Sequence, residues 1–479
     1  MAHSAPRRQF GIMFYMPVIR SERDTIAAIA TASGKGALCV IRLSGPDALK
    51  TASKFLRRNG KPAELRERMA ELFDLTDGTE LLDKTIATFY KAPRTFTGED
   101  MVELSCHASP YIAARVLALC VENGARPAEP GEFSRRAFLN GKMDLAQAEG
   151  ICDLIAASSA QAHRAAISLT EGRLSRTLEE MKTGLQDLLA EMEGRLDDPD
   201  DELPPLDKDA ALARLSSIEN EMRALCKTFR YGSIVKNGIA SAIAGAPNSG
   251  KSSLLNALSG YDRAIVSPTA GTTRDTVEET IDIGGILLRL TDTAGIRKHA
   301  LDPAEAEGIR RTKAAIAKAD LVFFVLDLSR DLSEDLPVWE LIKSGAEEGG
   351  KTIIAVLNKA DIAPAGKPLP TWLEGVRKIA VSTKTGDGVA ELRHLALQAV
   401  SREDGGDSPM ILTSSRHYEA LLGAAEETAA CAERLSAGGE PELCAEHLRR
   451  SLNSLGQIAG ETTPDDILGI VFGKFCVGK

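Results

Sequence analysis

The chain has 479 residues, 43% of them hydrophobic, and a formal net charge of −10 at pH 7. The length predicts about three domains, and the absence of an apolar run long enough to cross a bilayer excludes a membrane-spanning protein. The acidic charge argues against a surface coated for nucleic-acid binding, which needs clustered Lys and Arg. Eight scattered cysteines without a CxxC pair indicate neither zinc nor dithiol chemistry, and favour a reducing, cytoplasmic setting.

Residues 1–23 are predicted to form an N-terminal extension outside any folded domain. They contain four arginines and a short apolar patch at residues 10–16. The patch is too short for a secretory signal and lacks a small-residue cleavage site. We expect a disordered extension, or a start site placed upstream of Met16, and assign the segment no function.

Residues 24–143 are predicted to form a compact α+β domain. Short β-type runs at residues 37–43, 86–90 and 101–105 are separated by turn residues. A helix is expected over residues 111–122, because its apolar residues have helical spacing and an Asn-Gly pair follows it as a C-cap should.

The next region is predicted to be helical. Residues 144–193 carry alanine and leucine stripes without an internal proline, and a proline-rich acidic segment at residues 197–205 separates them from a second helix at residues 210–228. Helical patterns return at residues 416–433 and 442–458, after an acidic linker. Since neither set can bury its apolar stripe alone, we expect residues 144–236 and 401–479 to pack as one helical domain. Residues 237–400 would then be an insertion.

The inserted segment opens with a phosphate-binding motif. Gly245-Ala-Pro-Asn-Ser-Gly-Lys-Ser252 fits the pattern GxxxxGKS and lies between a strand-like run, residues 239–244, and a helix-forming run, residues 253–258. Glycines let the backbone approach phosphates, and the helix N-terminus directs N–H groups at the anion. Lys251 is expected to reach the β- and γ-phosphates, and the hydroxyl of Ser252 to bind Mg²⁺. Taken alone, the motif is also compatible with a chance Gly-rich turn.

Further motifs follow in the order of a GTPase. Asp292-Thr-Ala-Gly295 ends a strand-like run as a second switch would, and Gly271-Thr-Thr-Arg-Asp275 supplies threonines for the first. The aspartate of an NKxD motif, here Asn358-Lys-Ala-Asp361, accepts hydrogen bonds from guanine that adenine cannot offer, so the nucleotide should be GTP. The predicted contacts are Asn248, Ser249, Gly250, Lys251, Ser252, Ser253, Asp292, Thr293, Ala294, Gly295, Asn358, Lys359, Asp361, Ser382, Thr383 and Lys384. The expected fold is therefore multidomain, α/β and α, with an inserted Ras-like domain whose mostly parallel sheet has helices on both faces.

Motifs along nearly the whole chain beyond the extension resemble the MnmE (TrmE) family of tRNA-modification GTPases. They are Asp24-Thr-Ile, Ile41-Arg-Leu-Ser-Gly45, Phe96-Thr-Gly-Glu-Asp100, Pro130-Gly-Glu-Phe-Ser134, Ala137-Phe-Leu-Asn140, Asp144-Leu-Ala-Gln-Ala-Glu149, the Pro-Asn form of the phosphate loop and the ending Phe475-Cys-Val-Gly-Lys479. The Cys-x-Gly-Lys ending in particular is absent from other GTPases of this group.

The resemblance implies an enzyme that acts with the flavoprotein MnmG on the wobble uridine of certain tRNAs. It would add an aminomethyl or carboxymethylaminomethyl group at C5, with the carbon taken from a 5,10-methylene or formyl tetrahydrofolate. The N-terminal domain would dimerise and bind the folate through Arg42, Glu103, Lys142 and Lys479. A carboxylate such as Glu103 suits the N–H donors of a pterin, while Arg42 and Lys142 suit a glutamate tail. Taken singly, each is equally a surface or salt-bridged charge.

Cys476 is a candidate catalytic residue in this resemblance. Its thiolate could add to C6 of uracil and so activate C5, provided that neighbours such as Lys474 or Lys479 lower its pKa. A cysteine three residues from the end of the chain is otherwise most often incidental.

The hydrolytic residues differ from those of Ras. Ile296 stands where Ras carries its water-orienting glutamine, and the family pattern assigns the role to Glu305, with Glu307 as the alternative. No arginine finger is evident, and the resemblance implies a potassium ion held by Asn248, Ser267, Thr269 and Thr272 when two GTPase domains meet. Ser252 and Thr273 are the expected magnesium ligands.

A function of another class stays open at this point: a regulatory GTPase switch that acts in ribosome assembly and catalyses only hydrolysis. A scaffold whose nucleotide merely stabilises a dimer is a weaker option, because the set of loop motifs is complete. The N-terminal domain and the cysteine-containing tail favour the tRNA-modifying enzyme, since a simple switch has no use for them.

Overall fold

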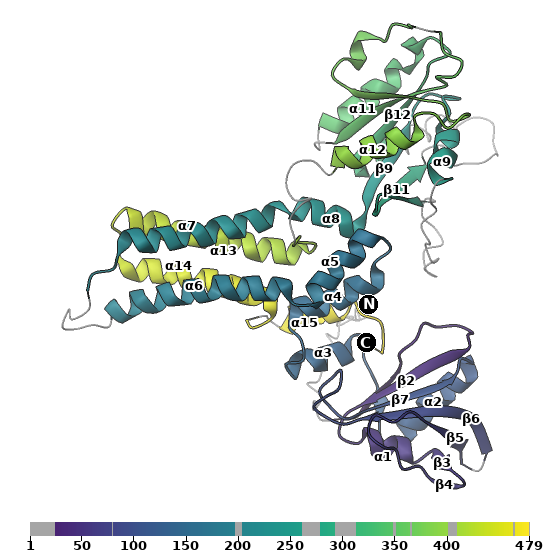
Figure 1. Cartoon of the computed structure of the whole chain (residues 1–479), viewed down its shortest axis with the longest axis vertical. Coiled ribbons are helices and arrows are strands. Elements are labelled where there is room, and N and C mark those ends of the chain that lie inside the picture. The colour runs from purple at the N-terminus through teal and green to yellow at the C-terminus, as the bar shows by residue number, and fades with distance from the viewer. Residues whose placement is uncertain are drawn as a thin grey trace, which may run out of the picture. The chain divides into compact units, whose positions relative to one another are not determined.

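The computed structural model describes residues 24–78, 80–196, 204–260, 278–292, 313–347, 351–364, 366–400, 410–462 and 465–478 (Figure 1). The chain packs as two compact units, residues 1–143 together with 465–479, and residues 144–464. We expected the whole of residues 401–479 to pack with the helical region, whereas residues 465–478 pack with the N-terminal unit. The domain boundaries themselves stay a prediction.

An eight-stranded sheet forms the N-terminal unit, in the order β4-β3-β5-β6-β7-β2-β1-β8. Its pairings are antiparallel except between β1 and β8. Alternation along β7 buries Val102, Leu104 and Cys106 and leaves Glu103 and Ser105 on the other face. Its elements are β1 (Ile26–Ile29), β2 (Leu38–Ser44), α1 (Ala48–Ser53), β3 (Leu56–Arg58), β4 (Lys61–Pro62), β5 (Glu71–Asp77), β6 (Glu80–Tyr90), β7 (Met101–His107), α2 (Pro110–Glu122), β8 (Arg126–Pro127), α3 (Glu132–Leu139) and α15 (Asp465–Phe472).

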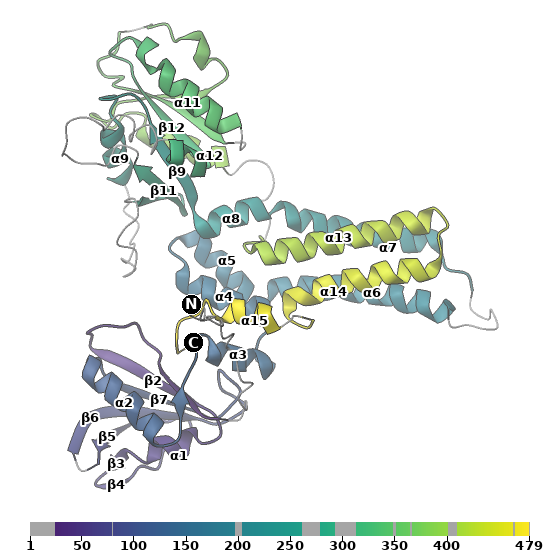
Figure 2. The same cartoon turned by 180° about the vertical axis from the view of Figure 1, so that it is seen from behind.

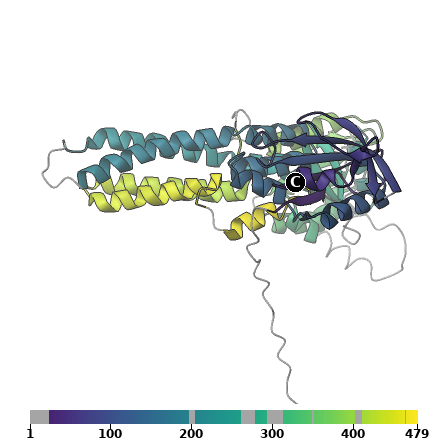
Figure 3. The same ribbon diagram turned by 90° about the horizontal axis from the view of Figure 1, so that it is seen from below.

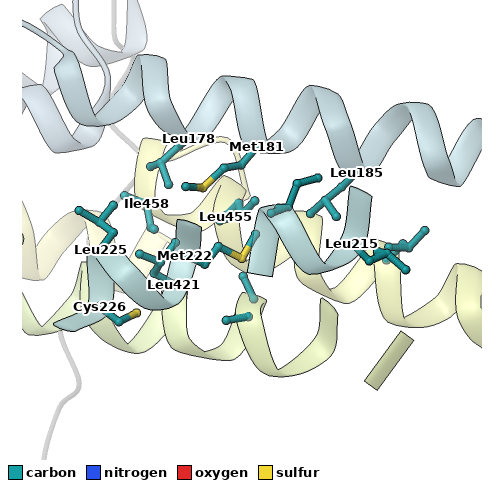
Figure 4. Packing of buried hydrophobic residues seen from close by; sticks show 14 of the residues in the cluster. Leu178, Met181, Leu185, Leu215, Met222, Leu225, Cys226, Leu421, Leu455 and Ile458 are labelled. Carbon is teal, nitrogen blue, oxygen red and sulfur yellow. The ribbon is translucent and has the colours of Figure 1, made fainter. Parts of the chain in front are cut away.

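Four long helices form a bundle in the second unit: α6 (Arg173–Leu196), α7 (Lys208–Lys227), α13 (Ser415–Ser436) and α14 (Pro441–Ala459). They lie side by side along their length (Figures 1 and 3). Each contributes leucine or methionine to a shared buried core, in which Leu185, Met222, Leu421 and Leu455 are fully buried (Figure 4). Segments on either side of the insertion thus bury each other's apolar stripes, as expected.

Residues 144–196 form three helices, α4 (Leu145–Ala156), α5 (Ala160–Thr170) and α6, where the sequence suggested one long helical stretch. Ser159 caps α5 by accepting a hydrogen bond from the backbone N–H of Ala162. Gly172, with φ +70°, adopts the left-handed conformation that separates α5 from α6. These breaks need no proline, which is why the absence of proline did not exclude them.

The inserted segment contains a six-stranded sheet in the order β10-β11-β9-β12-β13-β14, in which only β10 is antiparallel. Alternate residues of its strands enter two apolar clusters, one with α9 and α12 and one with α11 and the short helix at residues 313–318 (Figure 2). The prediction of a mostly parallel sheet with helices on both faces is confirmed. The elements are β9 (Ile239–Ala244), α9 (Lys251–Ser259), β10 (Glu278–Ile283), β11 (Ile286–Asp292), β12 (Leu321–Asp327), α11 (Leu336–Glu347), β13 (Thr352–Asn358), β14 (Arg377–Val381) and α12 (Val389–Val400).

The connections to the helices are held close together. Helix α8 (Phe229–Asn237) leads into β9, and the returning chain at Leu412 donates a backbone hydrogen bond to the hydroxyl of Thr228, at 3.0 Å. A Cβ on Gly232 would lie 2.0 Å from the carbonyl oxygen of Leu412, so glycine is required at this crossing. Across the described ranges, no helix has both the length and the apolar character needed to cross a membrane.

Candidate functional sites

The phosphate loop joins the end of β9 to the start of α9, as predicted. Two of its glycines lie against other backbone or side-chain atoms: a Cβ on Gly245 would be 2.4 Å from the carbonyl oxygen of Val325, and one on Gly250 would be 2.1 Å from Nδ2 of Asn358. Asn248 has φ +62°, a conformation that asparagine tolerates better than most residues. Glycine is therefore required at positions 245 and 250, and the N-terminus of α9, which directly follows the loop, favours an anion such as phosphate.

Lys251 begins α9 and folds back over this loop. Its Nζ donates hydrogen bonds to the carbonyl oxygens of Gly245 and Ala246, at 2.9 and 2.8 Å. Ser252 and Ser253, in the first turn of the helix, are exposed, whereas Ser249 is fully buried. A lysine held over an anion-binding loop by neutral carbonyls can turn to a phosphate when nucleotide enters.

Asn358, at the end of β13, joins the phosphate loop to the loop after β14. Its Nδ2 donates to the carbonyl oxygen of Ser249 at 2.9 Å, and its Oδ1 accepts from the backbone N–H of Thr383 at 3.3 Å. The hydroxyl of Ser382 donates to Oδ1 of Asp361 at 2.8 Å. The residues expected to bind guanine are therefore brought together at the same edge of the sheet.

Lys359 has φ +61° and pairs with the carboxylate of Asp327, at 2.6 Å. Burial alone would raise the pKa of Asp327, but the hydrogen bond from Lys359, together with two from Ser329, holds this pKa below its usual value. The carboxylate of Asp327 thus stays charged and holds the ammonium group of Lys359 at the end of β12.

Asp335 was missed by the sequence reasoning. It is fully buried at the end of the 3₁₀ turn Leu332–Asp335, where it pairs with Arg330 at 3.1 Å. Burial raises its pKa, while the charge of Arg330 and a hydrogen bond from the backbone N–H of Ala246 oppose that effect. The side chain of Asp335 therefore holds the phosphate loop in place through the backbone N–H of Ala246. The only local signal was an acidic residue beside Leu332 and Leu336.

Several predicted residues lie outside the described ranges. Asp292 ends β11, opposite Ile243 of β9, which brings its backbone to the edge of the sheet that carries the phosphate loop. The predicted residues outside the described ranges are Ser267, Thr269, Thr272, Thr273, Thr293, Ala294, Gly295, Glu305, Glu307 and Lys479.

A second site lies in the N-terminal unit. Arg42 of β2 and Glu103 of β7 are cross-strand partners, and both Nε and Nη2 of the arginine donate to Oε1 of the glutamate, at 2.9 and 2.8 Å. The guanidinium carbon lies 5.7 Å from the ring centre of Phe96 and 5.8 Å from that of Phe133. Tyr90 was not predicted; burial and the charge of Glu103, to which it hydrogen-bonds, raise its pKa. This combination of fork, carboxylate and rings suits a planar ligand with N–H donors and an acidic tail.

Lys142 is not joined to this pair. Its Nζ donates to the carbonyl oxygen of Pro93 at 3.0 Å, and its side chain lies beside Gly98. The loop between β6 and β7, residues 91–100, also carries Phe96, so one loop borders both Lys142 and the Arg42–Glu103 pair.

A network of charged residues fixes that loop. Arg136 of α3 pairs with Asp24 at 2.6 Å, with Glu132 at 3.0 Å and with Glu99 at 3.1 Å. Arg126 pairs with Asp24 and Glu132 as well. The pKa values of Asp24 and Glu132 fall below their usual values because these arginines outweigh the effect of burial. The motifs around Glu99 and Glu132 therefore stabilise the N-terminal unit through internal ion pairs.

The C-terminal tail packs on the same unit. Phe472 and Phe475 are buried, and Phe472 lies 6.1 Å, ring to ring, from Phe138 of α3. Val477 forms an isolated bridge with Pro130, and the carbonyl oxygen of Gly478 accepts from Nη1 of Arg42 at 3.4 Å. Cys476 is exposed between these anchors. The tail therefore brings the predicted cysteine into the unit that carries Arg42 and Glu103.

Comparisons with known proteins cover nearly the whole chain. A family model described as "MnmE helical domain" matches residues 145–476, and one described as "GTP-binding protein TrmE N-terminus" matches residues 25–142. A relative from Geobacter metallireducens named "tRNA modification GTPase MnmE" is 41% identical over 461 residues, covering 95% of this chain and 99% of the relative. A relative of the same name from Akkermansia muciniphila is 42% identical over 463 residues, with the same coverage.

Solved structures are similar to the chain more distantly. The G domain of the T. maritima FeoB iron transporter is 25% identical and covers 34% of this chain and 98% of its own, with a TM-score of 0.24. Aquifex aeolicus Era bound to GDP and AlF₄⁻ is 27% identical and covers 39% and 65%, with a TM-score of 0.27. At these scores the solved structures carry no weight, and the family assignment depends on the family models and the sequence relatives.

Proposed function

Because this chain belongs to the MnmE family of tRNA modification GTPases, we propose that it couples potassium-activated GTP hydrolysis to modification of the wobble uridine at C5. Hydrolysis of GTP is the activity of the family, and the loops around Lys251 and Asn358 fit the nucleotide. The observation that carries the rest is the contact of the tail with Arg42, which brings an exposed cysteine to the unit with a candidate folate site.

The GTPase residues divide by role. The backbone of the phosphate loop and Lys251 would hold the phosphates, Asp361 and Ser382 the guanine, and Ser252, with Thr273, a magnesium ion that neutralises charge on the phosphates. Glu305 would orient the attacking water, with Glu307 as the alternative. Alanine replacement of each glutamate in turn, with the hydrolysis rate and GTP affinity measured separately, decides between them: the correct one lowers the rate and leaves the affinity.

Potassium would supply the positive charge that a finger arginine supplies elsewhere. The left-handed Asn248 supports this, because its side chain starts from an exposed part of the phosphate loop. We expect hydrolysis to be much faster in potassium than in sodium at matched ionic strength, and Asn248→Ala to lose that difference. Thr385→Ala, outside the proposed ligands, is the control. Equal rates in both salts would refute cation activation and return the regulatory switch in ribosome assembly to contention.

The N-terminal site is proposed for a tetrahydrofolate, as its 5,10-methylene or formyl derivative. Glu103 would accept from the pterin, while Arg42, Lys142 and Lys479 would bind the acidic tail. Calorimetry with 5-formyltetrahydrofolate tests this: Arg42→Ala should abolish binding, whereas Lys61→Ala, on the far edge strand β4, should not. Retained affinity in the Arg42 variant would refute the site.

A homodimer through the N-terminal unit is part of the proposal. The open face of its sheet exposes Leu72 and Ile86, which are 59% and 47% exposed and pair directly across β5 and β6. Two adjacent apolar side chains on a sheet face favour a partner surface. Leu72→Lys combined with Ile86→Lys should convert a dimer to a monomer in sedimentation equilibrium, and an unchanged mass would exclude this face.

The flavoprotein MnmG and tRNA complete the proposed reaction, and the acidic charge suggests that the partner carries much of the tRNA contact. The eight free cysteines accord with the cytoplasm. The decisive experiment is C5 modification of tRNA by the two purified proteins with GTP and a folate donor. No modification, despite normal hydrolysis, would favour the switch.

A further inference from the structure

Gln161, in the first turn of α5, connects three segments of the second unit. Its backbone N–H donates to the carbonyl oxygen of Gly285 at 3.3 Å, and its Nε2 donates to that of Gly284 at 3.0 Å. Its Oε1 accepts from the hydroxyl of Tyr231, on α8, at 2.6 Å. The side-chain amide thus uses both of its ends, one on the turn between β10 and β11 and one on the helix that leads into β9.

The turn is shaped for this contact. Gly284 and Gly285 have φ values of +66° and +86°, which present their carbonyl groups to Gln161. A Cβ on Gly285 would approach Cγ of Gln161 to 3.1 Å, so the two residues meet closely. Asp282 fixes the turn by accepting from the N–H of Gly285 at 2.6 Å. Ala162, next to Gln161, is buried in the same apolar cluster as the strands of the hairpin.

The other end of this hairpin leads to both predicted switches. Strand β10 begins at Glu278, shortly after Thr273, and β11 ends at Asp292, directly before Thr293. The two strands pair continuously, from Glu278 opposite Thr291 to Ile283 opposite Ile286. Because the two strands are paired along their whole length, a displacement at the switch end of the hairpin can reach its turn.

Resting on the proposed function, we propose that Gln161 transmits the nucleotide state of the GTPase segment to helices α4 and α5. The turn and the switches are opposite ends of one hairpin, and Gln161 binds the turn through two carbonyl groups. A shift of the hairpin alters these bonds and gives α5 a different environment with GTP than with GDP, as a ligand-driven transition requires. The bond to Tyr231 holds the amide in the orientation that makes the contact.

Hydrogen–deuterium exchange of the full-length protein tests this inference, with GDP and with a non-hydrolysable GTP analogue. In the wild type, we expect exchange in residues 278–292 and in residues 145–170 to differ between the two nucleotides. Gln161→Ala keeps the backbone bond to Gly285 and loses the side-chain bonds to Gly284 and Tyr231. In this variant, the difference in residues 278–292 should persist and that in residues 145–170 should be clearly reduced. Tyr231→Phe should also reduce the difference in residues 145–170, because the hydroxyl that binds Gln161 is removed while the phenyl ring keeps the packing. Gln186→Ala, at an exposed position of α6, is the matched control and should resemble the wild type.

Two outcomes overturn the inference: a wild type whose residues 145–170 ignore the nucleotide, or a Gln161 variant that responds as the wild type does. Neither depends on tRNA modification, and nucleotide binding and GTP hydrolysis are measured on the same samples. Normal hydrolysis without a response in α5 therefore refutes the coupling alone, whereas absent hydrolysis refutes the proposed function. The alanine is compatible with folding, since it stands in the first turn of a helix.

Discussion

Replacing Asn358 with alanine tests how the nucleotide site is held together. The side chain is 1% exposed and joins the carbonyl oxygen of Ser249 to the backbone N–H of Thr383. The variant would leave the buried carbonyl oxygen of Ser249 and the partly buried N–H of Thr383 without their partner. One orphaned group costs about 1–3 kcal/mol, and the bond of 3.3 Å is the weaker of the two, so we expect the free energy of unfolding without nucleotide to fall by about 2–4 kcal/mol.

The assay uses the two tryptophans of the chain. Trp339 and Trp372 stack on each other and lie near Phe324 of β12, so their fluorescence reports on the GTPase segment. Urea titrations with and without GDP separate stability from binding. In the wild type, GDP at a hundredfold excess over its Kd should add about 2.7 kcal/mol.

Asp361→Asn is the matched variant. Asp361 is exposed and receives a hydrogen bond from Ser382, so its nucleotide-free stability should stay close to that of the wild type while the gain from GDP is lost. Asn358→Ala should lose both nucleotide-free stability and the gain in stability from GDP. If it unfolds at the wild-type urea concentration without nucleotide, the bonds between the loops add nothing and the reasoning is refuted.

Three further predictions concern other parts of the chain. Burial alone would raise the pKa of Glu149, but His417 and Arg416 outweigh it and lower this pKa from 4.5 to about 2. The contribution of Glu149 to stability is therefore complete above about pH 4.5 and is lost as the pH falls toward 2, so Glu149→Gln should reduce the loss of thermal stability in that range. An unchanged loss would exclude the contacts of Glu149 with His417 and Arg416 as its source. Gly232→Ala should lower the unfolding free energy by about 1–3 kcal/mol, because its Cβ would meet the carbonyl oxygen of Leu412, and wild-type stability would show that the crossing relaxes freely. Cys476→Ser should abolish tRNA modification and leave GTP hydrolysis intact, and unchanged modification would remove the thiol from the reaction.

The GTPase fold could be predicted from sequence because its signals are local. A short apolar run followed by Gly245-Ala-Pro-Asn-Ser-Gly-Lys-Ser252 specifies strand, loop and helix within residues 239–258, and parallel strands then bring their carboxyl ends to one edge. The support from Asp335 was not predictable, since the residue is distant in sequence from the loop it contacts and lies in an ordinary amphipathic stretch. Asp335 differs from the other acidic residues of its segment by its burial, which the spacing of residues in the sequence does not show.

The position of the tail could not be read from the sequence either. Phe472 and Phe475 would suit any apolar core, and the helical patterns before them favoured the bundle. What selects the N-terminal unit is a surface formed by α3, where the backbone at Gly131 comes so close to Phe472 that a Cβ would lie 2.3 Å from its carbonyl oxygen. Backbone complementarity of this kind appears only once both segments have folded.

The charges of the N-terminal unit fall into two groups that sequence alone leaves mixed. Arg136 and Glu132 are almost fully buried and satisfy each other, so they serve the fold. Arg42 and Glu103 keep 20% and 26% of their side chains exposed on the open face of the sheet. A partly exposed ion pair contributes little to stability, typically about 0–1 kcal/mol. The fold therefore has small need of this pair, which agrees with the role in ligand binding proposed for it.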